Sequence, residues 1–108
     1  RRQRQMCIRD RAYTAATGIE SSAQELLKTG ERIYYQERIM NAINGFRAAD
    51  DDLPERFFKE SGSGGDAIRI NPLDRETFLE ARAKYYRIRG LDEEGRPLAE
   101  KTRELGLE

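Results

Sequence analysis

Apolar positions between residues 22 and 45 repeat with the period of an α-helix. Ser22 and Glu25 form a capping-box pattern at its start, and Asn44-Gly45 is typical of a helix end. The apolar residues recur three or four positions apart and form a broad face: Ala23, Leu26, Leu27, Ile33, Tyr34, Met40 and Ile43, flanked by Tyr35, Ile39 and Ala42. A face this broad predicts a long helix buried on more than one side, with a close helix contact at Gly30.

The middle of the chain predicts shorter elements. Asp50–Asp52 ahead of Pro54 favours the start of a short helix, because acidic residues suit helix N-termini, and Phe57 and Phe58 are its expected anchors. The Ser/Gly-rich residues 61–65 predict a flexible loop or linker. Residues 67–70 are compatible with a short extended segment.

Two more helices are expected in the last third of the chain. One begins with Asp74 as its cap and ends before Gly90, and a turn containing Gly95 follows it. The last helix runs from Pro97 through Leu105. The predicted fold is therefore mainly α: an irregular multi-helix domain fragment with a long first helix and at most a short extended segment near residues 67–70.

Composition makes independent stability doubtful. The chain has 108 residues, of which 37% are hydrophobic and 37% are charged. A chain of this length fits one domain or a piece of a larger one, and its balance of apolar and charged residues is poor for an isolated core. Alone, it should expose the apolar face around Ile33, Tyr34 and Met40 and be marginally soluble.

The first 11 residues differ from the rest. The net charge is zero, but RRQRQMCIRDR contains five Arg and one Asp, so the remaining 97 residues are acidic overall. This stretch resembles translated sequencing-adapter sequence, and a disordered basic tail is the alternative. We interpret residues 1–11 as a non-native or disordered arm and residues 12–108 as a helical domain.

Residue usage excludes several kinds of site. Cys7 is the only cysteine and there is no histidine, so an internal disulfide, a structural zinc site and Ser-His or Cys-His dyads are excluded. The sequence has no run of about 18 apolar residues, so we expect no membrane span.

Four groups of residues have the composition of a functional site, and each has a simpler structural interpretation. The carboxylates of Asp50–Asp52 suit helix capping better than a metal. For Glu31 and Glu37, ion pairs with Arg32 or Arg38, or simple exposure, are favoured over burial with raised pKa values. Residues 62–65 lack the context of a phosphate loop. The basic stretch RAKYYRIRG is better explained by packing than by nucleic-acid binding. We therefore predict no catalytic, cofactor-binding or metal-binding residue and no nucleic-acid partner.

Three segments, in order, resemble the C-terminal region of the aldehyde ferredoxin oxidoreductase family. The first, AATGIESSAQELLKTGERIYYQERIMN, resembles the family's Ala-Ala-Thr-Gly entry to a long helix carrying Gly-Glu-Arg-Ile. The second, DDDLPERFFKE, resembles its Asp-rich Leu-Pro-Glu-Arg turn. The third, PLDRETFLEARAKYYRIRGLDEEGRPLAEKTRELGL, resembles its closing Tyr-Tyr, Arg-Gly and Asp-Glu-Glu-Gly-Arg-Pro run.

The resemblance implies part of a cytoplasmic oxidoreductase that converts aldehydes to carboxylic acids and passes electrons to ferredoxin. It implies a tungsten or molybdenum bis-pterin and one [4Fe–4S] cluster. The family's pterin-binding residues lie upstream of these segments, and the sequence around Cys7 does not match a cluster ligand, so both groups are expected to be held outside these residues. The rest of its own polypeptide is then the main partner. The fragment is expected to help enclose the cofactor and substrate channel and to be inactive alone. The alternative is a stand-alone helical interaction module.

Overall fold

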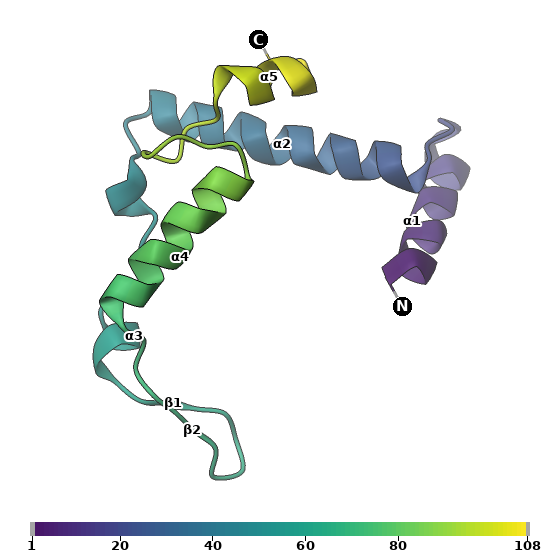
Figure 1. The fold of residues 1–108 in the computed structure, drawn as a ribbon. Coiled ribbons are helices and arrows are strands. Elements are labelled where there is room, and N and C mark those ends of the chain that lie inside the picture. Colours follow the sequence, from purple (N-terminus) through teal and green to yellow (C-terminus); the bar gives the residue numbers. More distant parts are fainter. Residues whose placement is uncertain (1, 108) are drawn as a thin grey trace.

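The computed structural model describes residues 2–107 and is mainly helical, as predicted. Helices α2 and α4 form the two long arms of a corner, with α1 at the far end of α2 and a small hairpin beyond α4 (Figure 1). The elements in chain order are α1 (Arg2–Thr17), α2 (Ala23–Ile43), the 3-10 helix η1 (Ala48–Asp50), α3 (Arg56–Lys59), β1 (Gly62–Ser63), β2 (Arg69–Ile70), α4 (Arg75–Ile88) and α5 (Ala99–Leu105).

Helix α1 was not expected, so the long helix is the second element rather than the first. Its sequence, RQRQMCIRDRAYTAAT, is rich in residues with high helix propensity, such as Arg, Gln, Met and Ala. Its apolar residues do not gather on one side, and none of the side chains at 7–17 is buried. A search for an amphipathic stripe therefore misses a helix that propensity alone favours. The non-native origin of residues 1–11 stays a prediction.

The two ends of α2 follow the sequence. Ser22 is the N-cap, and its hydroxyl accepts a hydrogen bond of 3.1 Å from the backbone N–H of Glu25. Asn44 is the C-cap, and Gly45 takes a left-handed conformation with φ +92°. Both predicted boundaries are confirmed.

The aspartate triplet does not cap a helix at Pro54, which corrects our expectation. Helix α3 is a single turn that begins at Arg56, after a Glu55 N-cap whose side chain makes no capping hydrogen bond. The three carboxylates instead bind other groups: Asp50 accepts from the backbone N–H of Arg47, and the other two aspartates pair with arginines. Asp50 thus caps the preceding helix η1 rather than α3, and tertiary partners hold Asp51 and Asp52.

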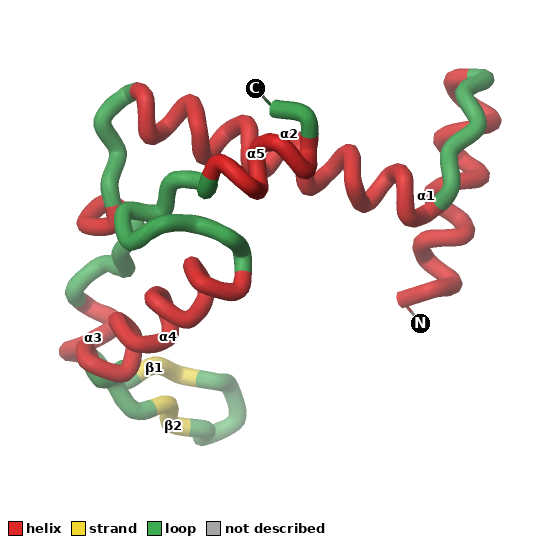
Figure 2. The backbone as a smooth tube through the Cα atoms, turned by 45° about the horizontal axis from the view of Figure 1, so that its top comes forward, coloured by secondary structure: helices red, strands yellow, loops and turns green. Residues whose placement is uncertain are grey.

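A two-stranded antiparallel hairpin extends beyond α4 (Figure 2). Ile70 pairs with Gly62 and Arg69 pairs with Ser63. The predicted extended segment is confirmed at residues 69–70. The glycine-rich segment expected to be a loop supplies the other strand, because Gly62 and Gly64 leave room for Ile70 and Ile68 against the backbone.

The last third of the chain matches the prediction closely. Asp74 caps α4 by accepting a hydrogen bond of 3.0 Å from the backbone N–H of Thr77. An antiparallel bridge between Leu91 and Pro97 closes the following turn. Helix α5 begins two residues after Pro97 and ends at Gly106, whose φ is +67°.

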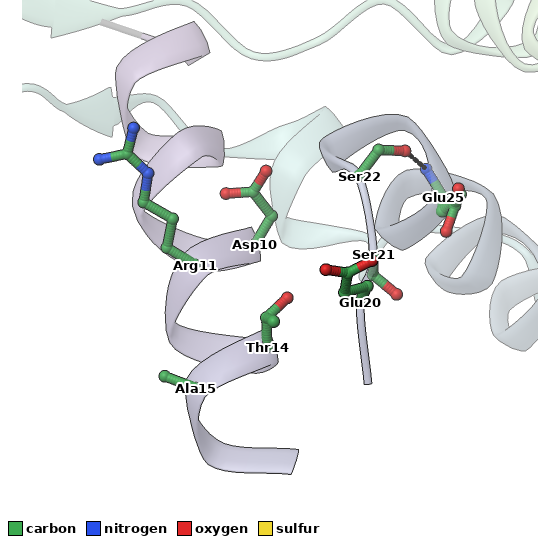
Figure 3. Close-up of a pocket in the computed structure, with 8 residues that line it drawn as sticks. All are labelled: Asp10, Arg11, Thr14, Ala15, Glu20, Ser21, Ser22 and Glu25. Carbon is green, nitrogen blue, oxygen red and sulfur yellow. Dashed lines mark hydrogen bonds between the residues drawn. The ribbon is translucent and has the colours of Figure 1, made fainter. Parts of the chain in front are cut away.

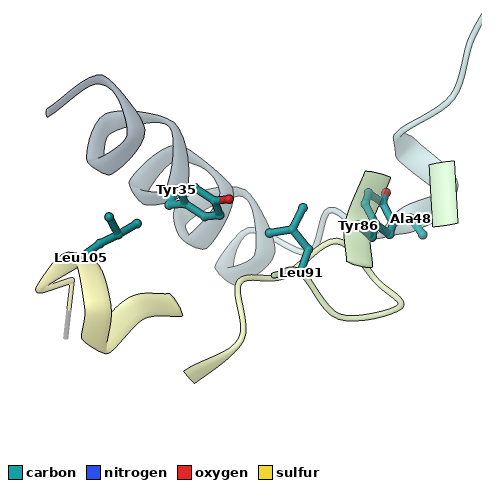
Figure 4. Packing of buried hydrophobic residues seen from close by; sticks show 5 residues of the cluster. All are labelled: Tyr35, Ala48, Tyr86, Leu91 and Leu105. Carbon is teal, nitrogen blue, oxygen red and sulfur yellow. The ribbon is translucent and has the colours of Figure 1, made fainter. Parts of the chain in front are cut away.

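The hydrophobic core is small and lies where α2, η1, α4 and α5 meet (Figure 4). Tyr35 of α2 is its largest fully buried residue, with 1% of its surface exposed. The side chain of Leu105 from α5 covers one side of Tyr35, and Leu91 lies between Tyr35 and Tyr86 (Figure 4). The cluster consists of Tyr35, Ala48, Tyr86, Leu91 and Leu105.

The molecule is much more open than a compact domain. Its radius of gyration is 18.4 Å, whereas a compact chain of this length has about 13 Å. Its accessible surface is 9018 Å², whereas a compact protein of this mass exposes about 6,200 Å². Ile33 and Met40 remain 57% and 53% exposed, as predicted, although Tyr34 is partly covered.

A substitution at Gly95 tests the packing of the turn onto the core. Gly95 has φ +78°, and an added Cβ would lie 3.1 Å from Cζ of Tyr86 and 3.2 Å from Nη2 of Arg38. We expect Gly95→Ala to lower the free energy of unfolding by about 2–4 kcal/mol, from backbone strain and crowding together. In Gly45→Ala, where φ is +92° and nothing lies within 4 Å, strain alone should cost about 1 kcal/mol. Equal losses in thermal or chemical denaturation would contradict the packing.

Candidate functional site

The main cluster of polar side chains lies beside the core, where α2, η1 and α4 converge. Arg38 of α2, Asp51 after η1 and Tyr86 of α4 form its centre, and we call these three residues the polar node. Nη2 of Arg38 lies 2.7 Å from Oδ2 of Asp51. The hydroxyl of Tyr86 donates to the same carboxylate oxygen over 2.5 Å.

Backbone groups around η1 are held by charged side chains next to the node. The guanidinium of Arg82 donates to the carbonyl oxygens of Ala48 and Asp51, at 2.6 and 3.1 Å. The carboxylate of Glu94 accepts a hydrogen bond of 3.2 Å from the backbone N–H of Ala48. The node thus ties three helical elements and the 91–97 turn together.

The electrostatics of the node favour the charged pair. The bond from Arg38 holds the pKa of the Asp51 carboxyl below its usual value, with a further contribution from the Tyr86 hydroxyl. Burial, followed by the hydrogen bond to Asp51, raises the pKa of Tyr86. The Arg38 guanidinium also lies 5.5 Å from the centre of the Tyr86 ring, within range of a cation–π contact.

A second polar contact joins the middle of α2 to the end of α4. The hydroxyls of Tyr34 and Tyr85 are 2.7 Å apart, and the hydroxyl of Tyr35 donates to the carbonyl of Arg89 over 2.5 Å. Burial and the bond to Tyr85 raise the pKa of Tyr34 to about 12. The Tyr34 phenol is therefore uncharged at neutral pH. The hydroxyls of Tyr34, Tyr35 and Tyr85 act as hydrogen-bonding links between the two helices.

An open groove separates α1 from the start of α2 (Figure 3). Asp10, Arg11, Glu20 and Glu25 line it, and the Ser22 hydroxyl at its rim is engaged in capping α2. Oδ1 of Asp10 is buried and accepts no hydrogen bond from the residues that the structure describes. The groove is polar and wide, and its carboxylates do not converge on one point.

The acidic residues considered as candidate sites in the sequence have different partners in the structure. Asp51 joins the node, whereas Asp52 forms a two-bonded pair with Arg75 at 2.7 and 2.8 Å. Glu31 pairs with Lys101 of α5 at 3.2 Å, rather than with Arg32, and Glu37 is exposed. Among residues 2–107, no group of three potential metal ligands is present.

The basic, tyrosine-containing stretch of α4 divides between two roles. Tyr86 is 4% exposed and belongs to the core, while Tyr85 is 40% exposed and contacts Tyr34. Packing of Tyr86 therefore follows the prediction. Cys7 is exposed on α1. No helix within residues 2–107 is long and apolar enough to cross a bilayer.

The polar node was not predicted from the sequence. Arg38 was expected only as an ion-pair partner for Glu31 or Glu37, although it lies three residues after Tyr35 and hence on the buried side of α2. An arginine at such a position signals a paired charge, because an unpaired one is costly to bury. Arg82 and Glu94 gave no comparable signal.

Comparison with known proteins decides the family. A family model described as "Aldehyde ferredoxin oxidoreductase, domains 2 & 3" matches residues 7–107. The chain belongs to the aldehyde ferredoxin oxidoreductase family. The resemblance seen in the sequence is thus confirmed, and the match begins inside the 1–11 segment.

Curated relatives in the aldehyde ferredoxin oxidoreductase family share over a third of the aligned residues. The tungsten-containing aldehyde ferredoxin oxidoreductase of Thermococcus kodakarensis is 37% identical over an alignment of 98 residues, which covers 86% of this chain and 15% of that protein. The enzyme of the same name from Pyrococcus horikoshii is 37% identical over 99 residues, and this alignment covers 87% of this chain and 15% of that enzyme. The enzyme of the same name from Pyrococcus furiosus is 36% identical over 98 residues, and this alignment covers 86% of this chain and 15% of that enzyme. The chain spans about one seventh of the length of these relatives.

Proposed function

We propose that this chain is the C-terminal helical part of an aldehyde ferredoxin oxidoreductase-like enzyme, with residues 12–108 as the native portion. The observation that carries this proposal is the family match over residues 7–107, which covers only 15% of each relative. The reaction of the whole protein is the oxidation of an aldehyde to a carboxylic acid, with electrons passed to ferredoxin. The whole protein is a cytoplasmic enzyme.

The residues of this chain do not fit the redox groups that such an enzyme uses. A [4Fe–4S] cluster takes four cysteine thiolates, and this chain has one cysteine, which is exposed on α1. Among the described residues there is also no three-ligand group for a metal ion. Other parts of the polypeptide therefore hold the tungsten or molybdenum bis-pterin and the cluster.

The role proposed for the chain is to enclose the cofactor and substrate channel, without activity of its own. Its open shape supports this role, since it exposes about 2,800 Å² more surface than a compact protein of equal mass. The polar node and the paired tyrosines give the inner corner rigidity without presenting a reactive group. The rigid corner can thus serve as a wall.

A chimaera tests the proposal. Residues 12–107 would replace the matching C-terminal segment of the Pyrococcus furiosus enzyme, with the intact enzyme and the enzyme truncated at the same point as controls. We expect the chimaera to retain metal and cluster and to reduce ferredoxin with an aldehyde, whereas the truncated enzyme should be inactive. A folded, fully loaded chimaera without this activity would contradict the proposal.

A further inference from the structure

Helix α2 carries a second apolar side that the structure leaves uncovered. Tyr35 and Ala42 point to the core, while Ile33 and Met40 lie on the opposite side of the helix, as 3.6 residues per turn requires. Ile33 is 57% exposed and Met40 is 53% exposed. Ile43, near the helix end, is 73% exposed.

The spacing on this side is that of a helix-packing face. Leu26, which is half-buried, Ile33 and Met40 follow one another at intervals of seven residues, and Ile43 lies three residues after Met40. We call these four residues the outer seam. A seven-residue interval keeps apolar side chains facing a neighbouring helix that crosses at about 20°.

A glycine next to the outer seam leaves room for close approach. Gly30 lies one turn before Ile33, and an added Cβ there would meet nothing within 4 Å. Glycine in a helix interior costs about 1 kcal/mol relative to alanine. Nothing within residues 2–107 uses the space at Gly30, so a helix from outside these residues is its natural neighbour.

The amount of exposed surface indicates which molecule supplies that helix. The excess over a compact protein is about 2,800 Å², whereas each partner in an interface of standard size buries about 800 Å². A second copy seated on the outer seam would leave most of the excess uncovered. The curated relatives are more than six times longer than the matched segment, so their remaining 85% is the larger body available.

We propose that the outer seam packs against an α-helix supplied by the rest of this protein's own polypeptide. This inference rests on the proposed function, because it takes the chain to be part of a longer protein. The partner helix presents an apolar face to the outer seam, and its axis is roughly parallel or antiparallel to that of α2. The core side of α2 and the outer seam would then both be buried, in agreement with the broad apolar face in its sequence.

Thiol labelling read by peptide mass spectrometry tests the proposal in the chimaera. Ile33→Cys places a thiol on the outer seam, and Ile68→Cys is the matched control, since Ile68 is 60% exposed at the hairpin. We expect Cys labelling at position 33 to be at least about tenfold slower than at position 68 in the chimaera, because burial requires local opening before reaction. In the isolated chain the two rates should agree within about threefold.

Each other outcome has a definite meaning. Equal labelling in a folded chimaera that oxidises aldehydes would overturn the outer seam and leave the proposed function intact. Slow labelling at position 33 in a loaded but inactive chimaera would support the seam while contradicting the function. Slow labelling in the isolated chain, with a dimeric mass in solution, would overturn the proposal in favour of a second copy. Should the chimaera fail to fold, the same rates are measured in the complex of this chain co-expressed with the truncated relative, where absence of protection overturns the proposal.

Discussion

Tyr35→Ala is expected to abolish cooperative thermal unfolding of the isolated chain. Tyr35 is 1% exposed and lies at the centre of a five-residue cluster, so truncation leaves a cavity that no neighbour can fill. Removing a buried aromatic side chain costs about 3–5 kcal/mol. That loss is of the same size as the whole stability of a small core. Circular dichroism against temperature would show a sloping change instead of a sigmoidal transition.

Tyr35→Phe is the matched control for the cavity. It retains the ring and removes only the hydroxyl that donates to the carbonyl of Arg89. We expect a loss of about 1 kcal/mol and a transition that remains cooperative. If Tyr35→Ala and Tyr35→Phe melted alike, the core assigned to the chain would be wrong.

Asp51→Ala is expected to lower the free energy of unfolding by about 1.5–3 kcal/mol. It leaves the Arg38 guanidinium without its carboxylate, in a side chain that is only 16% exposed. Breaking a fully buried pair costs about 3–5 kcal/mol. We expect less because the Asp51 side chain is 39% exposed and water screens the charge in part.

The pH dependence of stability provides an independent readout of Asp51. Its folded pKa is lowered, so the pair contributes stability above the usual carboxyl pKa near 4 and loses it as the pH falls through the folded value. The chain and its Asp51→Asn variant should therefore converge in denaturation midpoint as the pH falls below about 4. A difference that stays constant over this range would contradict the assigned ion pair. Asp52→Asn, in an exposed pair with Arg75, is the control and should shift the pH 7 midpoint less.

Helix boundaries were predictable where local chemistry sets them. Ser22, Asp74 and Gly106 occupy caps whose hydrogen bonds or left-handed conformation depend on a few neighbouring atoms. Elements that depend on distant partners were predicted poorly. The glycine-rich Gly62–Ser63 becomes a strand only because Arg69–Ile70 folds back beside it. Asp51 and Asp52 pair with arginines that are distant in the sequence instead of capping α3.

The polar node could not be assembled from the sequence for the same reason. Arg38 and Asp51 are 13 positions apart, and Tyr86 lies 35 residues beyond Asp51. Periodicity shows that Arg38 and Tyr86 face inward, but it does not show that they face the same carboxylate. Only the corner between α2 and α4 brings them together (Figure 1).

We propose that this chain is part of a larger oxidoreductase polypeptide, and sequencing the source DNA across the Ala12 codon and further upstream is the most direct test. We expect an open frame that departs from RRQRQMCIRDR and continues into a region with the cysteines of a [4Fe–4S] cluster. A stop codon and a start site close to Tyr13 would instead establish a stand-alone helical domain.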